Sequence, residues 1–491
     1  MTIFFWRPIH LLTAGGVMVA MLSCGAARLI SQSASQSASE SASSSVASRS
    51  VVDNTVNKAL PTLRDDGGSV CDPNESVVSR GGRYSTDVKL TASVALSGSD
   101  GVDVVMTQHG AIAAVNTDDG SKLYWVNPAT GEMAQSVALR GSVTDLAFDG
   151  SDLLVVATDN KILKLAAASG DVVSEIPLKG VSRVAISPDG HVGAIADKTV
   201  YLYDKSGANV FSQQRNYTAV TDVEVLSCKS KQLVYVSSFK NEWFIDLNDQ
   251  RNPVQIARLE ALDFKGNVKW SLFSDATESI KQNVADTRLY RVTLGRDGYL
   301  YTAGESAGTA TIFRWRGRPL TKGEKYGDAE PFVTQIDAYS QLYNSGSAHL
   351  SYYARVHPTK GELVTSQLSF PRLPDTKSNT MYLGDIAGSA DGRLYLGGAA
   401  SKSILNRDEL TINGKPIGEY EGRDRTWLSV SPNFKDRNFW TVLADKGGKG
   451  IVQGVDAGYG YSAALSNAES GTVPVTTGEA AGAVFLSFTA E

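Results

Sequence analysis

The sequence predicts an all-β fold made of repeated four-stranded units, and three observations lead to this expectation. Segments of about 40 residues repeat, since "LYWVNPATGEMAQSVALRGSVTDLAFDGSDLLVVAT" is followed by "ILKLAAASGDVVSEIPLKGVSRVAISPDGHVGAIAD". The apolar runs are short, rich in Val, Ile, Leu and Tyr, and bounded by Gly, Asp, Asn and Ser, as is typical of strands. No long amphipathic helical pattern occurs in the repeated part of the chain.

The turn residues support the same interpretation. Gly131, Gly170 and Gly207 follow one another at intervals of 39 and 37 residues. Asp-Gly pairs, which favour hairpins because glycine accepts a positive φ, precede apolar runs at 149–150, 189–190, 297–298 and 391–392. Four short strands in each repeat predict the blades of a β-propeller. Counting from about residue 88 to residue 491 gives about seven blades.

Later repeats are looser and carry insertions around 274–288, 317–347 and 401–425. The C-terminal segment "GAVFLSFTAE" has the composition of a strand. We expect it to help close the ring, because pairing the two ends of a propeller removes an open sheet edge.

The N-terminus reads as an export signal. Arg7 precedes the apolar run "LLTAGGVMVAMLSCGAA", which predicts a signal peptide over residues 1–27. Cys24 follows Met21-Leu22-Ser23, and two interpretations stay open: lipidation of Cys24, or cleavage nearby. Residues 28–60 are rich in Ser and Ala and predict a disordered linker, which leaves residues 61–491 for the propeller.

Charge and cysteine content limit the function further. A net charge of −5 and a pI of about 5.7 argue against nucleic-acid binding, which needs a basic surface. Membrane attachment is expected only through a lipid on Cys24. In an oxidising compartment Cys71 and Cys228 could pair, and two free thiols are the alternative.

Two resemblances follow from the motifs. Residues 121–247 resemble the WD40-like and quinoprotein-like (PQQ-type) repeat superfamily, since Asn127-Pro128-Ala129-Thr130-Gly131 matches its [DN]-x-x-[ST]-G turn. Residues 285–400 resemble uncharacterised bacterial secreted propeller proteins through "ADTRLYRVTLGRDGYLYTAGESAGTATIF", "YYARVHPTKGEL" and "SADGRLYLGGAA". The resemblances imply a propeller architecture and export, and imply no activity.

One motif raises the question of catalysis. Gly304-Glu305-Ser306-Ala307-Gly308 reads G-x-S-x-G, the nucleophile elbow of serine hydrolases. The helix that must follow such an elbow is missing, because residues 309–315 have the composition of a strand. We therefore expect a hairpin with its tip at 304–308. The hydrolase alternative would use Ser306 with His349 or His357 as base.

Other chemistry has weaker support. Zinc-type Cys/His spacings and EF-hand loops do not occur in the sequence, so we expect neither a metal nor a cofactor. Aromatic residues beside arginines suggest binding, at Trp315 with Arg316 and at Arg423 with Trp427. The alternative for these aromatics is packing between blades.

The sequence thus predicts a non-catalytic, secreted or surface-anchored propeller. We expect a protein or glycan partner, bound through the insertions at 317–347 and 401–425. An exported enzyme is one alternative, either a quinoprotein-like dehydrogenase or a serine hydrolase. A structural component of the cell envelope is another.

Overall fold

The structure is a computed structural model. It describes residues 62–65, 67–245, 250–273, 286–307, 333–335, 348–373, 378–444, 449–476 and 482–491. The chain divides into two units, residues 1–49 and 50–491, and every described residue lies in the second unit. The predicted signal peptide (1–27), Cys24 and the predicted linker (28–60) lie outside the described residues.

The described strands form seven large sheets, here called blades 1 to 7, and one small sheet. Blade 1 contains β3 (Asp100–Thr107), β4 (Gly110–Thr117), β5 (Gly120–Val126) and β6 (Met133–Leu139). Blade 2 contains β7 (Val143–Phe148), β8 (Leu153–Thr158), β9 (Lys161–Ala166) and β10 (Val172–Pro177). Blade 3 contains β11 (Val181–Ile186), β12 (Val192–Ala196), β13 (Thr199–Tyr203) and β14 (Asn209–Gln214). Blades 4 and 5 contain β15 (Ala219–Cys228), β16 (Lys231–Ile245), β17 (Arg251–Asp263), β18 (Val268–Leu272); and β19 (Thr287–Leu294), β20 (Leu300–Ala307), β22 (His349–Val356), β23 (Leu363–Ser369) with the added strand β21 (Val333–Gln335).

Blades 6 and 7 contain β24 (Met381–Gly388), β25 (Leu394–Ala400), β28 (Asp424–Val430), β29 (Arg437–Val442); and β30 (Gly450–Gly458), β31 (Tyr461–Ala468), β32 (Val484–Ala490), β2 (Leu90–Leu96). The small sheet consists of β1 (Asp87–Val88), β26 (Thr411–Ile412) and β27 (Lys415–Pro416), and a short 3₁₀ turn covers Arg407–Glu409. Within each blade, consecutive strands pair antiparallel, apart from β21, which pairs parallel to β23.

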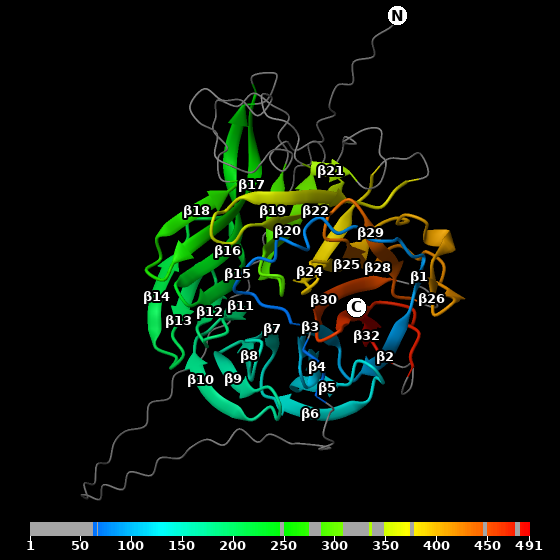
Figure 1. Ribbon diagram of the computed structural model, residues 1–491, viewed down its shortest axis with the longest axis horizontal. Helices are drawn as coiled ribbons and strands as arrows, with labels where there is room; N and C mark the ends of the chain where they lie inside the picture. Colours follow the sequence, from blue (N-terminus) through cyan, green and yellow to red (C-terminus); the bar gives the residue numbers. More distant parts are fainter. Residues whose placement is uncertain are drawn as a thin grey trace, which may run out of the picture. The chain divides into compact units, whose positions relative to one another are not determined.

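The blades close into a ring around a central channel. Their first strands, β3, β7, β11, β15, β19, β24 and β30, contact one another in that order, and β30 also contacts β3. Figure 1 shows this circular order. Apolar side chains fill the space between neighbouring blades; Trp125 of blade 1, for example, packs in one cluster with Leu146 and Leu154 of blade 2. The predicted all-β propeller of about seven blades is confirmed.

The two ends of the described chain complete blade 7 together. Strand β2 pairs antiparallel with β32, so that Leu90 lies opposite Thr489 and Leu96 lies opposite Val484. The expected pairing of the C-terminal strand with an N-terminal strand is confirmed.

Glycine turns connect the first and second strands of several blades. The predicted Asp-Gly pairs lie here, and the glycines have φ values of 85°, 91°, 80° and 84° at Gly150, Gly190, Gly298 and Gly392. Asp149 accepts hydrogen bonds from the backbone N–H groups of Ser151 and Leu153, which fixes its turn. This side of the ring is called the strap end.

The opposite side, where second strands lead into third strands, is called the loop-bearing end. The long connections between β20 and β22 and between β25 and β28, and the short connection between the long strands β16 and β17, all begin and end there. Both insertions that the sequence assigned to a binding face, 317–347 and 401–425, therefore join strands at the same end of the ring. Of the first, the structure describes only residues 333–335.

Residues 62–85, here called the strap, cross the ring before β1 begins (Figure 1). The backbone N–H of Leu63 donates to the carbonyl of Gln108 in blade 1, and that of Ser69 donates to the carbonyl of Arg296 in blade 5. Cys71 is joined by a disulfide to Cys228, at the end of β15 in blade 4.

Candidate functional site

An arm projects from blade 4 at the loop-bearing end. Strands β16 and β17 pair continuously from Leu233 opposite Asp263 to Ile245 opposite Arg251. Strand β15 pairs with β16 only as far as Phe239, and β18 pairs with β17 only from Leu259. The rest of the hairpin is therefore two-stranded and extends beyond the blade, as Figure 1 shows.

The arm carries an exposed tryptophan. Trp243 is 48% exposed, and the guanidinium carbon of Arg251 on the facing strand lies 4.8 Å from its ring centroid. Such a cation–π contact holds the ring in one orientation. Next to it, Glu242 pairs with Lys240 and Arg258, each at 3.1 Å. Because side chains alternate along a strand, the arm presents the fixed aromatic ring of Trp243 on one face and these charged side chains on the other.

A charged network ties the arm to blade 5. Arg288 pairs with Glu305, and Nδ1 of His349 lies 2.9 Å from Oε1 of Glu305. Arg288 also pairs with Asp286 at 3.2 Å, and Asp286 accepts a hydrogen bond from the backbone N–H of Gln255 in the arm. Because Asp286 contacts both Arg288 of blade 5 and Gln255 of the arm, the network orients the base of the arm.

A second exposed aromatic lies on blade 6 at the same end. Tyr382 is 44% exposed, and the guanidinium carbon of Arg423 lies 5.9 Å from its ring centroid. Arg423 pairs with Glu469, which also pairs with Lys449 at 3.1 Å. Trp243 and Tyr382 are the exposed aromatic side chains among the described large hydrophobic residues, and both belong to the loop-bearing end.

Of the four binding residues predicted from the sequence, only Arg423 lies on this described surface. Trp427 is fully buried and packs on Phe439, with ring centroids 5.3 Å apart, and Trp440 is also fully buried. The assignment of Trp427 to binding was therefore wrong, and the packing alternative holds for it. Trp315 and Arg316 lie outside the described residues.

The expected hairpin tip at 304–308 was also wrong. Residues Gly304 to Ala307 lie inside β20, with β19 on one side and β22 on the other. A Cβ on Gly304 would collide with the carbonyl oxygen of Arg288, at a bulge in the neighbouring strand. The glycine therefore serves a close approach of two backbones, and Gly308 lies outside the described residues.

Ser306 has neither of the bases proposed for a hydrolase. It is buried, it lies opposite Leu350, and its hydroxyl has no hydrogen-bond partner among the described residues. His349 lies opposite Ala307, so its side chain is on the other face of the sheet from Ser306. His357 follows the far end of β22, roughly 23 Å along the strand at about 3.3 Å per residue.

The central channel contains charged residues that sequence reasoning missed. Each first strand has a bulge, and the residue just after it is polar or charged in six blades. In the seventh blade the same position is a glycine. The seven residues at this position are here called the channel ring: Asp103, Asp145, Arg183, Asp222, Arg291, Asp385 and Gly454. The signal was present as a polar position recurring within apolar strands at intervals of 42, 38 and 39 residues over the first four blades.

The carboxylates of the ring join neighbouring blades. Asp145 accepts a hydrogen bond from the backbone N–H of Val184 in blade 3 at 2.7 Å, and Asp222 accepts one from Val292 in blade 5 at 2.9 Å. Arg183 pairs with Asp145 at 3.1 Å. The same arrangement recurs two residues further along both strands, where Glu224 accepts a hydrogen bond from the backbone N–H of Leu294 at 3.0 Å.

Burial dominates the titration of these groups. It raises the pKa of Asp222 and of Glu224 to about 7, and the pKa of Asp456 to about 6. Burial and the charges of Asp385 and Asp145 raise the pKa of Asp103 well above its usual range. The backbone hydrogen bonds that these carboxylates accept lower their pKa, so burial by the packed blades is the larger effect.

A cavity of about 470 Å³ occupies the channel between the ring and the strap. Residues of all seven first strands line it, and Leu63, Ser69 and Cys71 of the strap line its other end. The described residues contain no group of three or more His, Cys, Asp or Glu side chains placed to hold a metal ion. No described helix is long and apolar enough to cross a membrane.

Comparisons with known proteins give structural likenesses only. No family model and no curated protein matches the chain. Hydrazine synthase from Kuenenia stuttgartiensis matches with a TM-score of 0.45 and 11% identity, over 76% of this chain and 94% of that chain. BamB from Moraxella catarrhalis matches with a TM-score of 0.39 and 15% identity, over 82% of this chain and 97% of that chain. The Pan2 WD40 domain of Neurospora crassa matches with a TM-score of 0.45 and 7% identity, over 84% of this chain and 98% of that chain.

At these identities and overlaps, the comparisons indicate neither an activity nor a partner. The strand pairing of the chain itself carries the assignment of the fold.

Proposed function

We propose that this protein is an exported, non-catalytic β-propeller that binds a protein partner through its loop-bearing end. One observation carries the proposal: Trp243 and Tyr382 are both exposed at that end, each with an arginine against its ring. Aromatic and arginine side chains dominate the binding energy of protein interfaces. A rigid ring of blades holds the two positions at a fixed separation, which favours recognition of a folded partner.

The arginines favour a protein over a glycan. A sugar ring stacks on the face of an aromatic side chain, and Arg251 lies over the ring of Trp243. Charges of both signs also surround Tyr382, since Arg423 beside its ring pairs with Glu469 and Glu469 pairs with Lys449, which suits the polar rim of a protein interface. A glycan partner remains one outcome of the test below.

Export is supported by the N-terminal sequence and by the cysteines. The predicted signal over residues 1–27 and the predicted linker over 28–60 support a location outside the cytoplasm, with a lipid anchor if Cys24 is modified. A disulfide between Cys71 and Cys228 would persist in such an oxidising compartment. We therefore propose an extracellular or cell-envelope location.

The arrangement of the polar groups supports the proposal of a non-catalytic role. Ser306 and His349 face opposite sides of their sheet, and the carboxylates of the channel are engaged with backbone N–H groups. Catalysis by such groups needs a base within hydrogen-bonding reach of the proton that it removes.

Photo-cross-linking tests the proposal. A benzophenone side chain at position 243 or 382, introduced in the native host, should capture the same protein, whereas position 173 on the outer strand of blade 2 should not. With that protein purified, Trp243→Ala should weaken binding at least tenfold, a typical interface effect of about 1.4 kcal/mol or more. Val173→Ala, a control at a position that is more exposed than either aromatic residue, should leave Kd unchanged.

The outcomes separate the alternatives. Unchanged affinity in both Trp243→Ala and Tyr382→Ala would refute the proposed surface. Binding of purified protein to an oligosaccharide array, lost in Trp243→Ala, would replace the protein partner by a glycan.

A further inference from the structure

One edge of the arm has backbone groups that point away from the hairpin. In an antiparallel pair, the N–H and C=O groups of two facing residues either bond to each other or point to the outer edges. Trp243 of β16 faces Pro253 of β17. Because proline has no N–H to donate, this pair is of the second kind. The N–H and C=O of Trp243 therefore point to the outer edge of β16.

The neighbouring residues agree with this direction. Two residues before Trp243, the backbone N–H of Asn241 donates to Oγ1 of Thr218, which precedes β15 on the outer side of β16. On the facing strand, the N–H of Gln255 likewise donates outward, to Asp286. Since the direction of the backbone groups repeats every second residue along a strand, Trp243 has the same direction as Asn241.

The outer edge of β16 is open from this point on. Strand β15 pairs with β16 only as far as Phe239, and Thr218 accepts the N–H of Asn241. The C=O of Asn241 and both backbone groups of Trp243 have no backbone partner among the described residues. Here these three groups are called the open edge. Such an edge is a template for pairing with a strand of another chain.

The other edge of the arm is closed to such pairing. Pro253 lies on the outer edge of β17 and offers no N–H, which is how natural sheets block an edge. Elsewhere the chain covers edges with its own extended segments. Strand β21 adds to β23 of blade 5, and Ser85 forms a parallel bridge to Phe439 in the outer strand of blade 6. An extended segment is therefore the occupant that suits the open edge.

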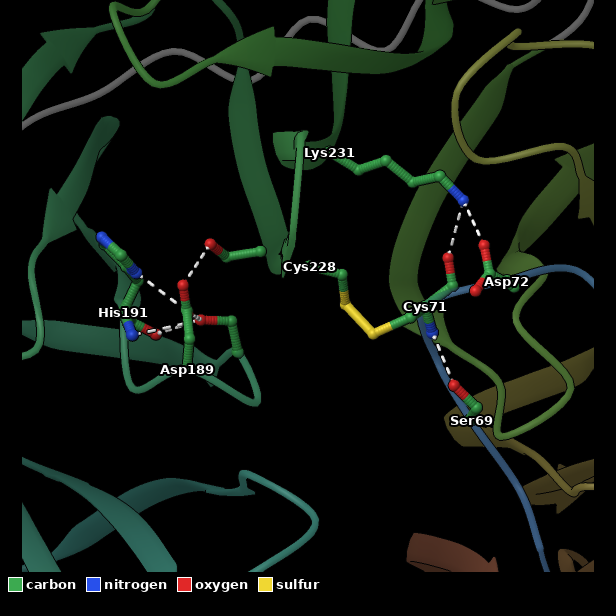
Figure 2. Close-up of a disulfide and its surroundings, with 9 residues drawn as sticks. Ser69, Cys71, Asp72, Asp189, His191, Cys228 and Lys231 are labelled. Carbon is green, nitrogen blue, oxygen red and sulfur yellow. Dashed lines mark hydrogen bonds and ion pairs between the residues drawn. A yellow bond between two sulfur atoms is a disulfide. The ribbon is translucent and has the colours of Figure 1, made fainter.

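Blade 4, which carries the arm, is fixed at its other end. Cys228, the last residue of β15, is joined to Cys71 by a disulfide, and Nζ of Lys231 donates to the carbonyl of Cys71 at 2.9 Å (Figure 2). At the base of the arm, the guanidinium carbon of Arg258 lies 5.5 Å from the ring centroid of Tyr217. An edge that is already ordered loses little conformational entropy when a strand adds to it.

We propose that the open edge of β16 accepts a strand from the edge of the partner's own sheet, through backbone hydrogen bonds to Asn241 and Trp243. This inference rests on the protein partner proposed above and names how that partner is held. Because side chains alternate, one residue of the added strand lies beside Trp243, where an aromatic or β-branched side chain fits. The residues next to it lie on the face of Glu242, where polar side chains fit.

Comparing alanine with proline at position 243 tests the added strand. Trp243→Ala removes the ring and keeps the N–H, whereas Trp243→Pro also removes the N–H and mirrors Pro253 across the arm. The probe is the protein captured by the benzophenone at position 382. It should bind Trp243→Pro at least tenfold more weakly than Trp243→Ala, because one of its own carbonyl groups loses a donor.

The outcomes distinguish this inference from the proposed function. Equal Kd values for the two variants, both weaker than the wild type, would keep the proposed surface and overturn the added strand. Wild-type Kd values in Trp243→Ala and Tyr382→Ala would refute the surface itself. A wild-type dimer in light scattering that becomes a monomer in Trp243→Pro would show that the edge pairs with a second copy, and would overturn the partner's strand.

Hydrogen exchange provides a second measurement on the wild type, which covers the case that proline disturbs the arm. In the complex with the captured protein, exchange of the Trp243 amide should slow at least tenfold, while the amide of Val173 on β10 keeps its rate. Protection of Glu242 and Val254, the bonded pair next to Trp243, reports whether the hairpin is intact in Trp243→Pro. An unchanged rate at Trp243 in the complex would overturn the proposal.

Discussion

The buried carboxylates of the channel predict a stability that decreases as the pH rises. Glu224 is the most direct case, because burial raises its pKa from 4.5 to about 7 while it accepts backbone hydrogen bonds from Leu294 and Val225. The folded protein thus binds this proton more tightly than the unfolded chain does. Asp222, with a pKa of about 7, behaves in the same way.

The sign and the size follow from linkage. A group whose pKa is raised on folding stabilises the folded state fully below its unfolded pKa, and this contribution is lost as the pH rises through the folded pKa. For Glu224 the window runs from about pH 4.5 to about 7. At about 1.4 kcal/mol for each pKa unit, its share of the unfolding free energy that is lost across the window is about 3 kcal/mol.

Urea unfolding followed by tryptophan fluorescence at pH 5 and at pH 8 measures the effect. The wild type should be less stable at pH 8, and Glu224→Gln should reduce the difference between the two pH values by about 3 kcal/mol. Glu419→Gln, at an exposed position near the loop-bearing end, is the matched control and should leave the difference unchanged. If Glu224→Gln left the pH dependence as large as in the wild type, the reasoning from burial would be refuted.

Further predictions concern single residues. Arg355 is fully buried with Asp297 3.8 Å away, so Arg355→Met should lower the urea-unfolding free energy by about 3–5 kcal/mol, and adding Asp297→Asn should restore part of it. Gly304→Ala should cost about 1–3 kcal/mol in the same assay, because its Cβ meets the neighbouring backbone; a neutral change would contradict the close packing. A fluorophosphonate probe should add no mass to the protein, and a gain that vanishes in Ser306→Ala would restore the hydrolase alternative. The intact mass of the exported protein should correspond to a chain without the residues before Cys24. An additional mass of acyl groups on Cys24 would distinguish lipidation from simple cleavage.

Local turn chemistry made much of the fold predictable from the sequence. The Asp-Gly pairs need a positive φ at glycine, and all four glycines have one. The spacing of Gly131, Gly170 and Gly207 likewise gave the period of the blades, and each of these glycines has a positive φ. These features depend on a few neighbouring residues, which is why a single sequence records them.

The predictions that were wrong, or that the sequence did not allow, concern contacts between distant segments. Gly304 was assigned to a turn because glycine accepts a positive φ, whereas the structure uses it where two backbones approach closely. The exposure of Trp243 depends on how far β16 extends beyond the blade. Only the unusual length of the strand-like run from 231 to 245 could have indicated it.

Contacts between distant segments also explain why the sequence predicted only part of the candidate site. Trp427 follows an arginine-rich stretch just as an exposed aromatic would, but its position in the third strand of blade 6 buries it against Phe439. Conversely, Asp145 and Asp222 lie within apolar strands and were overlooked, because their role depends on the neighbouring blade.

The shared blade 7 also sets the order of folding events. Leu90 and Thr489 are partners although almost the whole propeller lies between them in sequence. During synthesis the ring cannot close until residues 484–490 have emerged, and β2 waits for its partner throughout. Closure is therefore a late step with a high contact order. A chain that crosses a membrane before this step would do so with its ring still open.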